Sequence, residues 1–478
     1  MLAPFKHQAD VLAQSADLQH FAIFWEQGTG KTKLMLDNIV HLARRGEIDA
    51  VLVLAPNGVH RNWVTDEIPK HLGAGVDAEF WTSSKADTQR HQRTFQQMLK
   101  AKFPIVAMSY DAFMTKRGKA WSKKFLTERQ VMMILDEATA IKTPSAKRTM
   151  TIVAAGRYAK YKRILTGTPV TNGPFDVYAP MRFLDEHFWK QHGFPSFTEF
   201  KQFFGVWQKG TDPVRGHQYE YVVAYRNLPL LQGYIDPVSS RVTKDEVLDL
   251  PPKLYAKRYF DLSEAQQRIY NQIRDEAMAF LASGELVTSP LAITRLLRLQ
   301  QVTCNYLPVE VDPNTGDVLK YEDIDSTNPR LNCLGALLEE VSTQAIIWAK
   351  FRRDIDLIMK LLGDKAVRYD GATGDDERAE AKARFMAGEV QYFVGNPAAA
   401  GMGLTLTAAR TVIYYNNSFR LEDRLQSEDR AHRIGQVYSV EYVDIVAADT
   451  VDNRIVEALR NKVNIASQIT GDTLKEWI

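Results

Sequence analysis

A glycine-rich stretch near the N-terminus constrains the fold of this chain more than any other feature. The residues Glu26–Thr32 (EQGTGKT) follow an apolar run, Phe21–Trp25, and overlap the start of a stretch, Lys31–Arg45, whose apolar residues recur at helical spacing. Gly46 comes next, and glycine is common just past the end of a helix. A buried strand, a glycine-rich turn and a helix in this order are typical of a phosphate-binding loop, because the turn and the helix N-terminus present backbone N–H groups to anions.

The residues of this loop have separate expected roles toward ATP and Mg²⁺. Lys31 should pair with the β- and γ-phosphates, and Thr32 should ligate Mg²⁺. The strict GxxxxGK[ST] pattern is not met, because Trp25 occupies the position of its first glycine. The alternative is a glycine-rich turn that precedes a lysine by chance, but the strand before it, the helix after it and the complete GxGKT core disfavour that alternative. The other loop residues expected to contact the nucleotide are Gly28, Thr29 and Gly30.

Short, continuous apolar runs recur along the chain and indicate strands buried on both faces. After Phe21–Trp25, the first third of the chain has such runs at 51–54, 105–108, 131–135 and 163–165. The same rhythm returns at 345–348, 367–369, 392–394, 412–415 and 442–446. Such strands, separated by helical stretches, are typical of parallel sheets covered by helices. The sequence therefore predicts an α/β fold with two tandem lobes, each built on a parallel sheet.

The stretch between the two sets of strands, roughly 180–330, is rich in aromatic residues and helix-like segments, and we interpret it as a helical insertion. Within it, Lys209–Gln218 and Pro308–Pro329 are dominated by turn-forming residues and are expected to be exposed loops. The predicted domains are a nucleotide-binding lobe at 1–235, an inter-lobe linker with a helical protrusion at 236–330, and a second lobe at 331–478.

Two consecutive carboxylates, Asp136 and Glu137, directly follow the apolar run Val131–Leu135. A carboxylate at a strand end can hold Mg²⁺ through water, and a second one can orient and deprotonate the water that attacks the γ-phosphate. We assign the first role to Asp136 and the second to Glu137. A bare Asp-Glu pair more often has a surface or capping role, but the strand before it and the GxGKT core upstream favour catalysis.

Overall charge and cysteine content exclude several classes of protein. The 60 Lys and Arg residues nearly balance the 58 Asp and Glu residues, so any nucleic acid must be bound through local patches. The densest basic run, Lys116–Lys124, could equally well be a DNA contact or a solvated part of the surface. Arg295 and Arg298 could equally well contact DNA or pair with other residues of the chain. Two cysteines cannot form a disulfide framework, which suggests a reducing compartment. No apolar run reaches the roughly 18–20 residues of a membrane span, and no signal-peptide pattern opens the chain.

Three further motifs make the sequence recognisable. They are the DEAT box at Asp136–Thr139 with Ile141-Lys142, the run Leu165–Pro169 with Asn172, and the string Gln426–Gln436 (QSEDRAHRIGQ), which is the most specific of the three. Together they resemble the Swi/Snf family of DNA-translocating ATPases, which belongs to the second helicase superfamily, and the resemblance spans nearly the whole chain. It implies two RecA-like lobes, ATP and Mg²⁺ as ligands, and duplex DNA as the track.

The resemblance also implies roles for single residues. Gln8 fits the family's glutamine that recognises adenine. Trp63 follows the candidate DNA contact Asn62, and a role in DNA binding and a role in core packing explain it equally well. The segments Arg241–Asp245 and Leu250–Lys253 are similar to the family's inter-lobe signature. The residues that match DNA-contacting or second-lobe motifs are Pro56, Asn62, Ser109, Tyr110, Thr168, Asn172, Gly371, Gly401 and Gly403.

The QSEDRAHRIGQ string is expected to supply positive charge to the developing γ-phosphate. Arg430 and Arg433 are three residues apart, which places them on one face if the segment is helical, and Gln426 would share that face and sense the nucleotide. Arg433 is the better candidate for the γ-phosphate contact. The alternative is a helix in which these arginines form salt bridges with Glu428 and Asp429.

The chain departs from the family pattern at several positions. Thr139 stands where the family usually has histidine, which puts the detail of lobe coupling in doubt. Asn396-Pro397 replaces the usual Ser-Thr, and Asn416 and Phe419 replace the usual Asp and Trp. We expect these last changes to fall on DNA-facing or lobe-closure positions and to affect the efficiency of stepping.

The leading hypothesis is a double-stranded-DNA-stimulated ATPase that translocates along duplex DNA and displaces bound proteins or DNA structures. One alternative is a strand-separating DNA or RNA helicase of the same superfamily, and another is an ATP-binding scaffold that does not hydrolyse ATP. We expect a monomer that binds double-stranded DNA and no membrane. A compact motor suggests a bacterial or viral protein in the cytoplasm, or a nuclear one if the source is eukaryotic.

Overall fold

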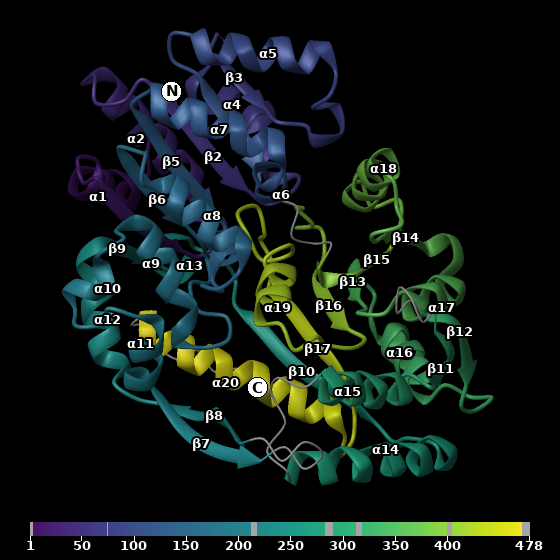
Figure 1. Ribbon diagram of the computed structural model, residues 1–478. Helices are drawn as coiled ribbons and strands as arrows, with labels where there is room; N and C mark the ends of the chain where they lie inside the picture. The colour runs from purple at the N-terminus through teal and green to yellow at the C-terminus, as the bar shows by residue number, and fades with distance from the viewer. Residues whose placement is uncertain are drawn as a thin grey trace. The chain divides into compact units, whose positions relative to one another are not determined.

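The computed structural model describes residues 3–73, 75–211, 218–282, 290–311, 318–398 and 404–470. The chain forms two compact units (Figure 1). The first unit comprises Met1–Phe204, Arg226–Asp249 and Asn464–Leu474, and the second comprises Gly205–Tyr225, Leu250–Val463 and Lys475–Ile478. Each unit is built on one parallel sheet, which confirms the predicted fold class.

The sheet of the first unit has seven strands, all paired in parallel. In spatial order they are β3 (Ala78–Phe80), β4 (Ile105–Ser109), β2 (Ala50–Ala55), β5 (Val131–Asp136), β6 (Tyr161–Leu165), β1 (His20–Trp25) and β9 (Ser239–Val242). The carboxyl ends of parallel strands lie at one edge of a sheet, so the segments after β1, β5 and β6 are neighbours at that edge.

Helices connect these strands and supply the apolar side chains of the core. They are α1 (Lys6–Ser15), α2 (Lys31–Arg44), α3 (Val59–Asn62), α4 (Ile68–Leu72), α5 (Gln89–Lys100), α6 (Tyr110–Met114), α7 (Lys116–Glu128), α8 (Lys147–Gly156), α9 (Tyr178–Leu184), α10 (Phe188–Gln191), α11 (Phe197–Phe204), α12 (Leu228–Ile235) and α13 (Lys244–Val247). A π-helix, Trp63–Glu67, joins α3 to α4. Buried Arg163 of β6 donates to the Ser15 carbonyl of α1 and to Asn38 Oδ1 of α2, each at 3.1 Å, and so fixes α1 to the core.

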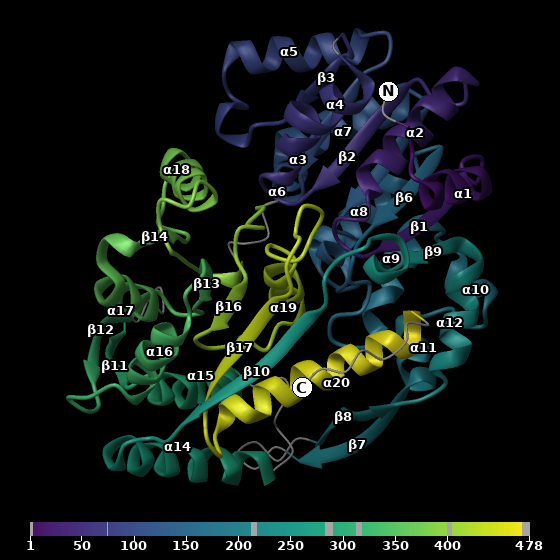
Figure 2. The same cartoon turned by 180° about the vertical axis from the view of Figure 1, so that it is seen from behind.

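The sheet of the second unit has six strands, again all parallel (Figure 2). In spatial order they are β10 (Lys253–Phe260), β17 (Val440–Ala447), β16 (Thr411–Tyr414), β13 (Ala345–Trp348), β15 (Tyr392–Gly395) and β14 (Ala366–Tyr369). Alternate residues of β13 enter two separate apolar clusters, Ile347 in one and Ile346 in the other, so both faces of this sheet are buried. The accompanying helices are α14 (Glu264–Ala282), α15 (Pro290–Thr303), α16 (Pro329–Glu340), α17 (Arg352–Leu362), α18 (Asp375–Met386), α19 (Leu421–Glu428) and α20 (Val451–Thr470).

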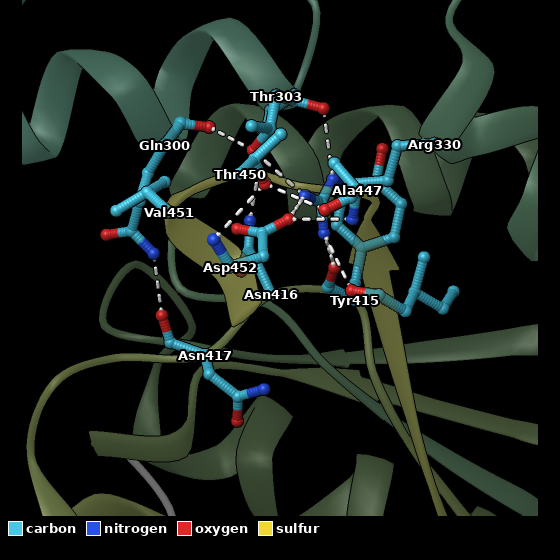
Figure 3. A network of polar contacts seen from close by, with 12 residues as sticks. Gln300, Thr303, Arg330, Tyr415, Asn416, Asn417, Ala447, Thr450, Val451 and Asp452 are labelled. Carbon is cyan, nitrogen blue, oxygen red and sulfur yellow. Dashed lines mark hydrogen bonds and ion pairs between the residues drawn. The ribbon is translucent and has the colours of Figure 1, made fainter. Parts of the chain in front are cut away.

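A buried arginine ties the helices of the second unit to its sheet (Figure 3). Arg330, at the start of α16, donates to the Thr303 carbonyl at 3.1 Å, to the Ile445 carbonyl of β17 at 3.1 Å and to the carboxylate of Asp452. Asp452 also accepts the backbone N–H of Ala447 at 3.1 Å. Because the pair is buried and its remaining donors are satisfied, it fixes α15, α16 and the start of α20 around the end of β17.

Two expected loops contain strands instead. Lys209–Gln218 includes the inner ends of an antiparallel ribbon, β7 (Gly205–Thr211) with β8 (Gln218–Tyr225), and Pro308–Pro329 includes most of a second ribbon, β11 (Tyr306–Val311) with β12 (Val318–Asp323). The loop prediction was wrong at 209–211, 218, 308–311 and 318–323, where pairing with a partner strand decides the conformation, and 212–217 and 312–317 lie outside the described residues. The interpretation of this region as purely helical therefore needs correction.

Candidate functional site

The phosphate-binding loop has the backbone that its sequence predicts. Gly28 and Gly30 have φ of +82° and +90°, which an L side chain rarely adopts, and Gly30 caps the N-terminus of α2. A Cβ on Gly30 would lie 2.1 Å from Gln8 Nε2, so a larger residue there would displace the Gln8 side chain from the loop. Gly46, with φ of +70°, follows the end of α2 as expected.

The polar groups of the loop are held by its own backbone. Lys31 Nζ donates to the carbonyls of Trp25 at 2.9 Å and Glu26 at 3.2 Å, and Thr29 Oγ1 donates to the Glu26 carbonyl at 2.7 Å. The ammonium of Lys31 therefore lies at the mouth of the loop, and Thr32 follows it in the first turn of α2. These positions fit the expected contacts with phosphate and Mg²⁺, which remain predictions.

Gln8 contacts the phosphate-binding loop from α1. Its Nε2 donates to the Gly30 carbonyl at 3.1 Å, and its Oε1 accepts the Phe5 N–H at 2.8 Å. Sequence reasoning missed His7, whose Nε2 donates to the Thr29 carbonyl at 2.9 Å. The structure thus links α1 to the loop, and recognition of adenine by Gln8 remains a prediction.

The acidic pair lies where β5 ends. Trp63 Nε1 donates to Asp136 Oδ2 at 2.8 Å, and Tyr110 OH donates to the Asp136 carbonyl at 2.9 Å. Burial raises the pKa of Asp136, and the Trp63 hydrogen bond and the charge of Lys31 oppose that shift. Glu137 adopts the left-handed region (φ +52°), an uncommon conformation for a non-glycine residue that is concentrated at functional sites.

The side chain of Glu137 faces the phosphate-binding loop and the segment after β6. Its Oε2 accepts a hydrogen bond from Thr166 Oγ1 at 3.3 Å, and its Oε1 accepts one from Gln27 Nε2 at 3.5 Å. Three segments that follow neighbouring strands therefore meet at this carboxylate, as the parallel sheet predicts. Gln27 and Thr166 were not singled out from the sequence, although both lie within motifs that were.

The segment after β6 is held by a second carboxylate that the sequence reasoning missed. Asp176 Oδ2 accepts the backbone N–H groups of Thr171 at 2.9 Å and Asn172 at 2.7 Å, and Lys142 Nζ donates to Thr171 Oγ1 at 2.7 Å. Asn172 is exposed, and Thr168 is half-buried. Both side chains are therefore at least partly accessible for the predicted DNA contact.

The other candidate DNA contacts divide into exposed and buried positions. Pro56 and Asn62 are half-buried and Gly371 is exposed, whereas the side chains of Ser109 and Tyr110 are buried. Ser109 Oγ accepts the Ala112 N–H at 3.0 Å as the cap of α6, so a DNA contact there would use backbone groups. Gly401 and Gly403 lie outside the described residues.

The helix predicted through the QSEDRAHRIGQ string ends at Glu428, so Arg430 and Arg433 lie in the turns that follow it. The argument from a shared helical face was wrong for these two residues. Their guanidinium groups nevertheless converge on the Leu404 carbonyl, at 3.2 Å from Arg430 Nη1 and 3.3 Å from Arg433 Nη1. Arg430 is 4% exposed and also donates to the Gln426 carbonyl at 3.0 Å, whereas Arg433 is half-buried.

A buried ionic cluster fixes α19 and the turn that carries these arginines. Glu428 accepts hydrogen bonds from Arg424 Nε at 2.8 Å and from Lys253 Nζ at 2.9 Å. Arg424 also donates a hydrogen bond to Asp444. Although burial opposes ionisation, the charges of Lys253 and Arg424 hold the pKa of Glu428 at about 2. Glu428 thus pairs with residues outside the string, and Gln426 Nε2 donates to Glu422 at 3.3 Å.

The residues that depart from the family pattern also have defined places. Asn396 Nδ2 donates to the Lys350 carbonyl at 2.7 Å, and Thr139 lies buried in the short helix Ala138–Ile141. Asn416 is 2% exposed, and its Nδ2 donates to Asp354 Oδ2 at 2.5 Å and to Cys304 Sγ at 3.2 Å. Asn416 was expected at a DNA-facing or lobe-closure position, and its burial in the core contradicts only the first of these alternatives.

The burial of Asp354 predicts that the free energy of unfolding depends on pH. Burial raises its pKa to about 6, against the hydrogen bond from Asn416 and the charge of Arg330. The folded protein thus binds this proton more tightly than the unfolded chain, and the stability that the site contributes is lost as pH rises through about 6. Relative to wild type, the unfolding free energy of Asp354→Asn should rise by about 1–2 kcal/mol between about pH 5 and about pH 8 in urea unfolding.

Asp356→Asn is the matched control for this prediction, since Asp356 is an exposed aspartate on the same helix, α17. A rise of the same size in Asp356→Asn would show that the effect is not specific to Asp354. A difference between Asp354→Asn and wild type that stays constant with pH would contradict a proton bound at Asp354.

The basic run Lys116–Lys124 forms most of helix α7 rather than a loop, with Trp121 and Phe125 on its buried side. Arg117 pairs with Asp87, and Arg298 Nη1 donates to Gln301 at 2.7 Å, which favours intramolecular pairing for Arg298.

Among the described residues, no helix combines the length and apolar character needed to cross a bilayer.

Two protein-family models match the chain. The SNF2-related domain model matches residues 17–306, and the helicase conserved C-terminal domain model matches residues 329–435. The protein named "Probable ATP-dependent DNA helicase CHR12" of Arabidopsis thaliana is 28% identical over 464 residues, and the transcription regulatory protein SNF2 of Saccharomyces cerevisiae is 25% identical over 471 residues. Each similarity covers 93% of this chain, but only 39% and 26% of those relatives.

A solved structure also resembles the chain. It is described as the Sulfolobus solfataricus SWI2/SNF2 ATPase core in complex with dsDNA, shares 20% identity, and is matched over 98% of this chain and 96% of that chain with a TM-score of 0.41. The family models carry the assignment, because the first of them alone matches more than half of the chain. The chain belongs to the SNF2-related family, the Swi/Snf group of the second helicase superfamily.

Proposed function

We propose that this chain is a DNA-dependent ATPase that translocates along double-stranded DNA. The observation that carries the proposal is the meeting of three segments at Glu137: the phosphate-binding loop through Gln27, the end of β5, and the segment after β6 through Thr166. A carboxylate in that position is suited to orient a water molecule toward a phosphate held by the loop. Relatives named as ATP-dependent helicases support the same activity.

The residues of the first unit fit ATP and Mg²⁺. The positive-φ glycines free backbone N–H groups for phosphate, and Lys31 adds a positive charge at the loop. Thr32, and Asp136 through water, would hold Mg²⁺ together with the nucleotide, because Mg²⁺ prefers oxygen ligands and phosphates. Bound Mg²⁺ supplies charge neutralisation at the β- and γ-phosphates.

The protein groups then have distinct tasks during hydrolysis. Glu137 orients the attacking water and accepts its proton, while Lys31 stabilises charge on the phosphate oxygens. Arg433 supplies further positive charge in the transition state, and Arg430 positions it by sharing the Leu404 carbonyl. Because these arginines belong to the second unit, closure of the two lobes around ATP would be coupled to the chemical step.

Movement along DNA requires backbone contacts on both lobes that alternate with the ATP cycle. In the first unit, Pro56, Asn62, Thr168 and Asn172 are accessible for phosphate contacts, and in the second unit Gly371 is. The small net charge of +2 suits a motor that must release DNA in every cycle. We propose a monomeric motor, nuclear in a eukaryote and cytoplasmic in a bacterium or a virus-infected bacterial cell.

ATP hydrolysis in the presence of different nucleic acids tests the proposal. Duplex DNA should stimulate turnover about tenfold or more, whereas RNA should not, because the proposed track is an intact DNA duplex. Lys31→Ala provides the background rate. Stimulation by RNA alone would refute the proposal, and no stimulation by any nucleic acid would favour an ATP-binding scaffold. ATP-dependent displacement of a triplex-forming strand distinguishes translocation from ATP hydrolysis without movement.

A further inference from the structure

Two buried aromatic side chains connect the candidate DNA track of the first unit to its acidic pair. We propose that Trp63 and Tyr110 are positioning residues that link DNA contacts at 56–62 and 109–110 to Asp136, the residue assigned to Mg²⁺. This inference rests on the proposed function, since it assumes that the chain binds both DNA and Mg²⁺ with nucleotide. It assigns to these two aromatics a task other than core packing or direct DNA contact.

Trp63 reaches the carboxylate of Asp136. It is 2% exposed, and its only side-chain donor, Nε1, lies 2.8 Å from Asp136 Oδ2. It follows Asn62 directly and opens the π-helix Trp63–Glu67, a rare conformation that is frequent at functional sites. The hydrogen bond fixes one oxygen of the carboxylate, which the backbone N–H of Glu137 also contacts.

Tyr110 reaches the backbone of the same residue from a second strand. It is 3% exposed, directly follows Ser109 at the end of β4, and donates its OH to the Asp136 carbonyl at 2.9 Å. The spatial order β4-β2-β5 explains how side chains from the segments after β4 and β2 both reach the end of β5. Asp136 is thus held at its carboxylate and its carbonyl by two different candidate DNA-contacting segments.

These two segments are also joined at the surface. Asn57 Nδ2, in the segment after β2, donates to Asp111 Oδ2 at 3.2 Å, and Asp111 is paired with Arg148 of α8. A displacement of either segment by a DNA backbone would therefore be shared by both and passed to Asp136. Outer groups that orient a metal-binding side chain commonly change metal affinity by about 10–100-fold when they are removed.

The first experiment measures binding of Mn²⁺, a paramagnetic substitute for Mg²⁺, to the full chain with ADP by electron paramagnetic resonance. Trp63→Phe removes the indole N–H and should weaken Mn²⁺ binding about tenfold. Trp121→Phe is the matched control, because Trp121 is also buried in the first unit and its Nε1 donates to the Phe95 carbonyl at 2.9 Å, away from Asp136. Equal Mn²⁺ affinities in the two folded variants would overturn the role of Trp63.

The second experiment uses Tyr110→Phe, which removes one oxygen atom and preserves the packed ring. The ratio of DNA-stimulated to basal turnover should fall about fivefold, while the dissociation constant for duplex DNA stays within about twofold of wild type. Tyr161→Phe is the control, since the OH of this buried tyrosine donates to Glu47 at 3.3 Å. An unchanged stimulation ratio in Tyr110→Phe would overturn the link to DNA.

The two measurements separate this inference from the proposed function. If wild type shows no stimulation by duplex DNA, the proposed function fails, and the Mn²⁺ comparison of Trp63→Phe with Trp121→Phe still decides whether Trp63 positions Asp136. If Trp63→Phe is unstable by circular dichroism, Mn²⁺ binding and stimulation in Tyr110→Phe decide the inference, and wild-type values for both would refute it.

Discussion

Glu137→Gln should lower DNA-stimulated ATP turnover by about 10²–10⁴-fold while nucleotide affinity stays within a few-fold of wild type. Glutamine keeps the size of the side chain and can still accept the hydrogen bond from Thr166, although its amide nitrogen cannot accept the longer one from Gln27. What is lost is the negative charge that orients and deprotonates the attacking water. Steady-state hydrolysis measures the loss, and titration with a fluorescent ATP analogue shows that binding persists.

Glu47→Gln is a suitable control, because Glu47 is a carboxylate of the same unit that pairs with Lys160 at 3.0 Å, away from the phosphate-binding loop. Its turnover should match that of wild type. Hydrolysis by Glu137→Gln within about threefold of wild type would show that another group activates the water. The conformation at position 137 makes a compensating rearrangement costly, since φ of +52° is maintained only by the surrounding contacts.

The central strands of both sheets, and the site at their ends, were predictable from the sequence. Strands such as β2 and β5 are buried on both faces and therefore have continuous apolar runs. Parallel topology then brings the segments after β1, β5 and β6 to one edge, which is why the phosphate-binding loop and Glu137 meet. The family resemblance drawn from the motifs is confirmed by the family models that match the chain.

The edge strands β9 and β10 could not be predicted in the same way. The sequence of β9 is Ser-Ser-Arg-Val, and in β10 (KLYAKRYF) basic residues interrupt the apolar ones, so neither has the continuous apolar run of a central strand. Their strand conformation comes from pairing with β1 and β17, partners that are distant in the sequence. Local propensity is a poor guide where backbone pairing with a distant strand decides the structure.

Contacts between residues that are distant in the sequence, around Asp136 and in the second unit, could not be predicted either. The sequence places Trp63 and Tyr110 beside candidate DNA contacts, but only the order of β4, β2 and β5 shows that both reach Asp136. Likewise, the spacing of Arg430 and Arg433 suggested a helix, whereas α19 ends at Glu428 and a positive φ at Gly435 continues the turn. Tertiary contacts to Leu404 bring the two guanidinium groups together instead.

Arg433→Ala should lower turnover by about 10³-fold or more, with little effect on folding. Arg433 is half-buried, and the Leu404 carbonyl that accepts a hydrogen bond from its Nη1 at 3.3 Å also accepts one from Arg430. Removing its charge therefore leaves the cluster of Glu428, Arg424 and Lys253 that holds α19. Single-turnover hydrolysis measures the chemical step, and thermal melting checks the fold.

Comparison with two other arginines shows whether the loss is catalytic. Arg410→Ala, at an exposed residue stacked on Tyr438 in the same unit, should hydrolyse ATP like wild type. Arg430→Ala should lower both turnover and melting temperature, because a buried guanidinium with hydrogen bonds to Gln426 and Leu404 is lost. A melting temperature that falls in Arg433→Ala as far as in Arg430→Ala would assign Arg433 a structural role. If turnover alone falls, the positive charge at position 433 acts on the reacting phosphate, and ATP hydrolysis depends on the second unit.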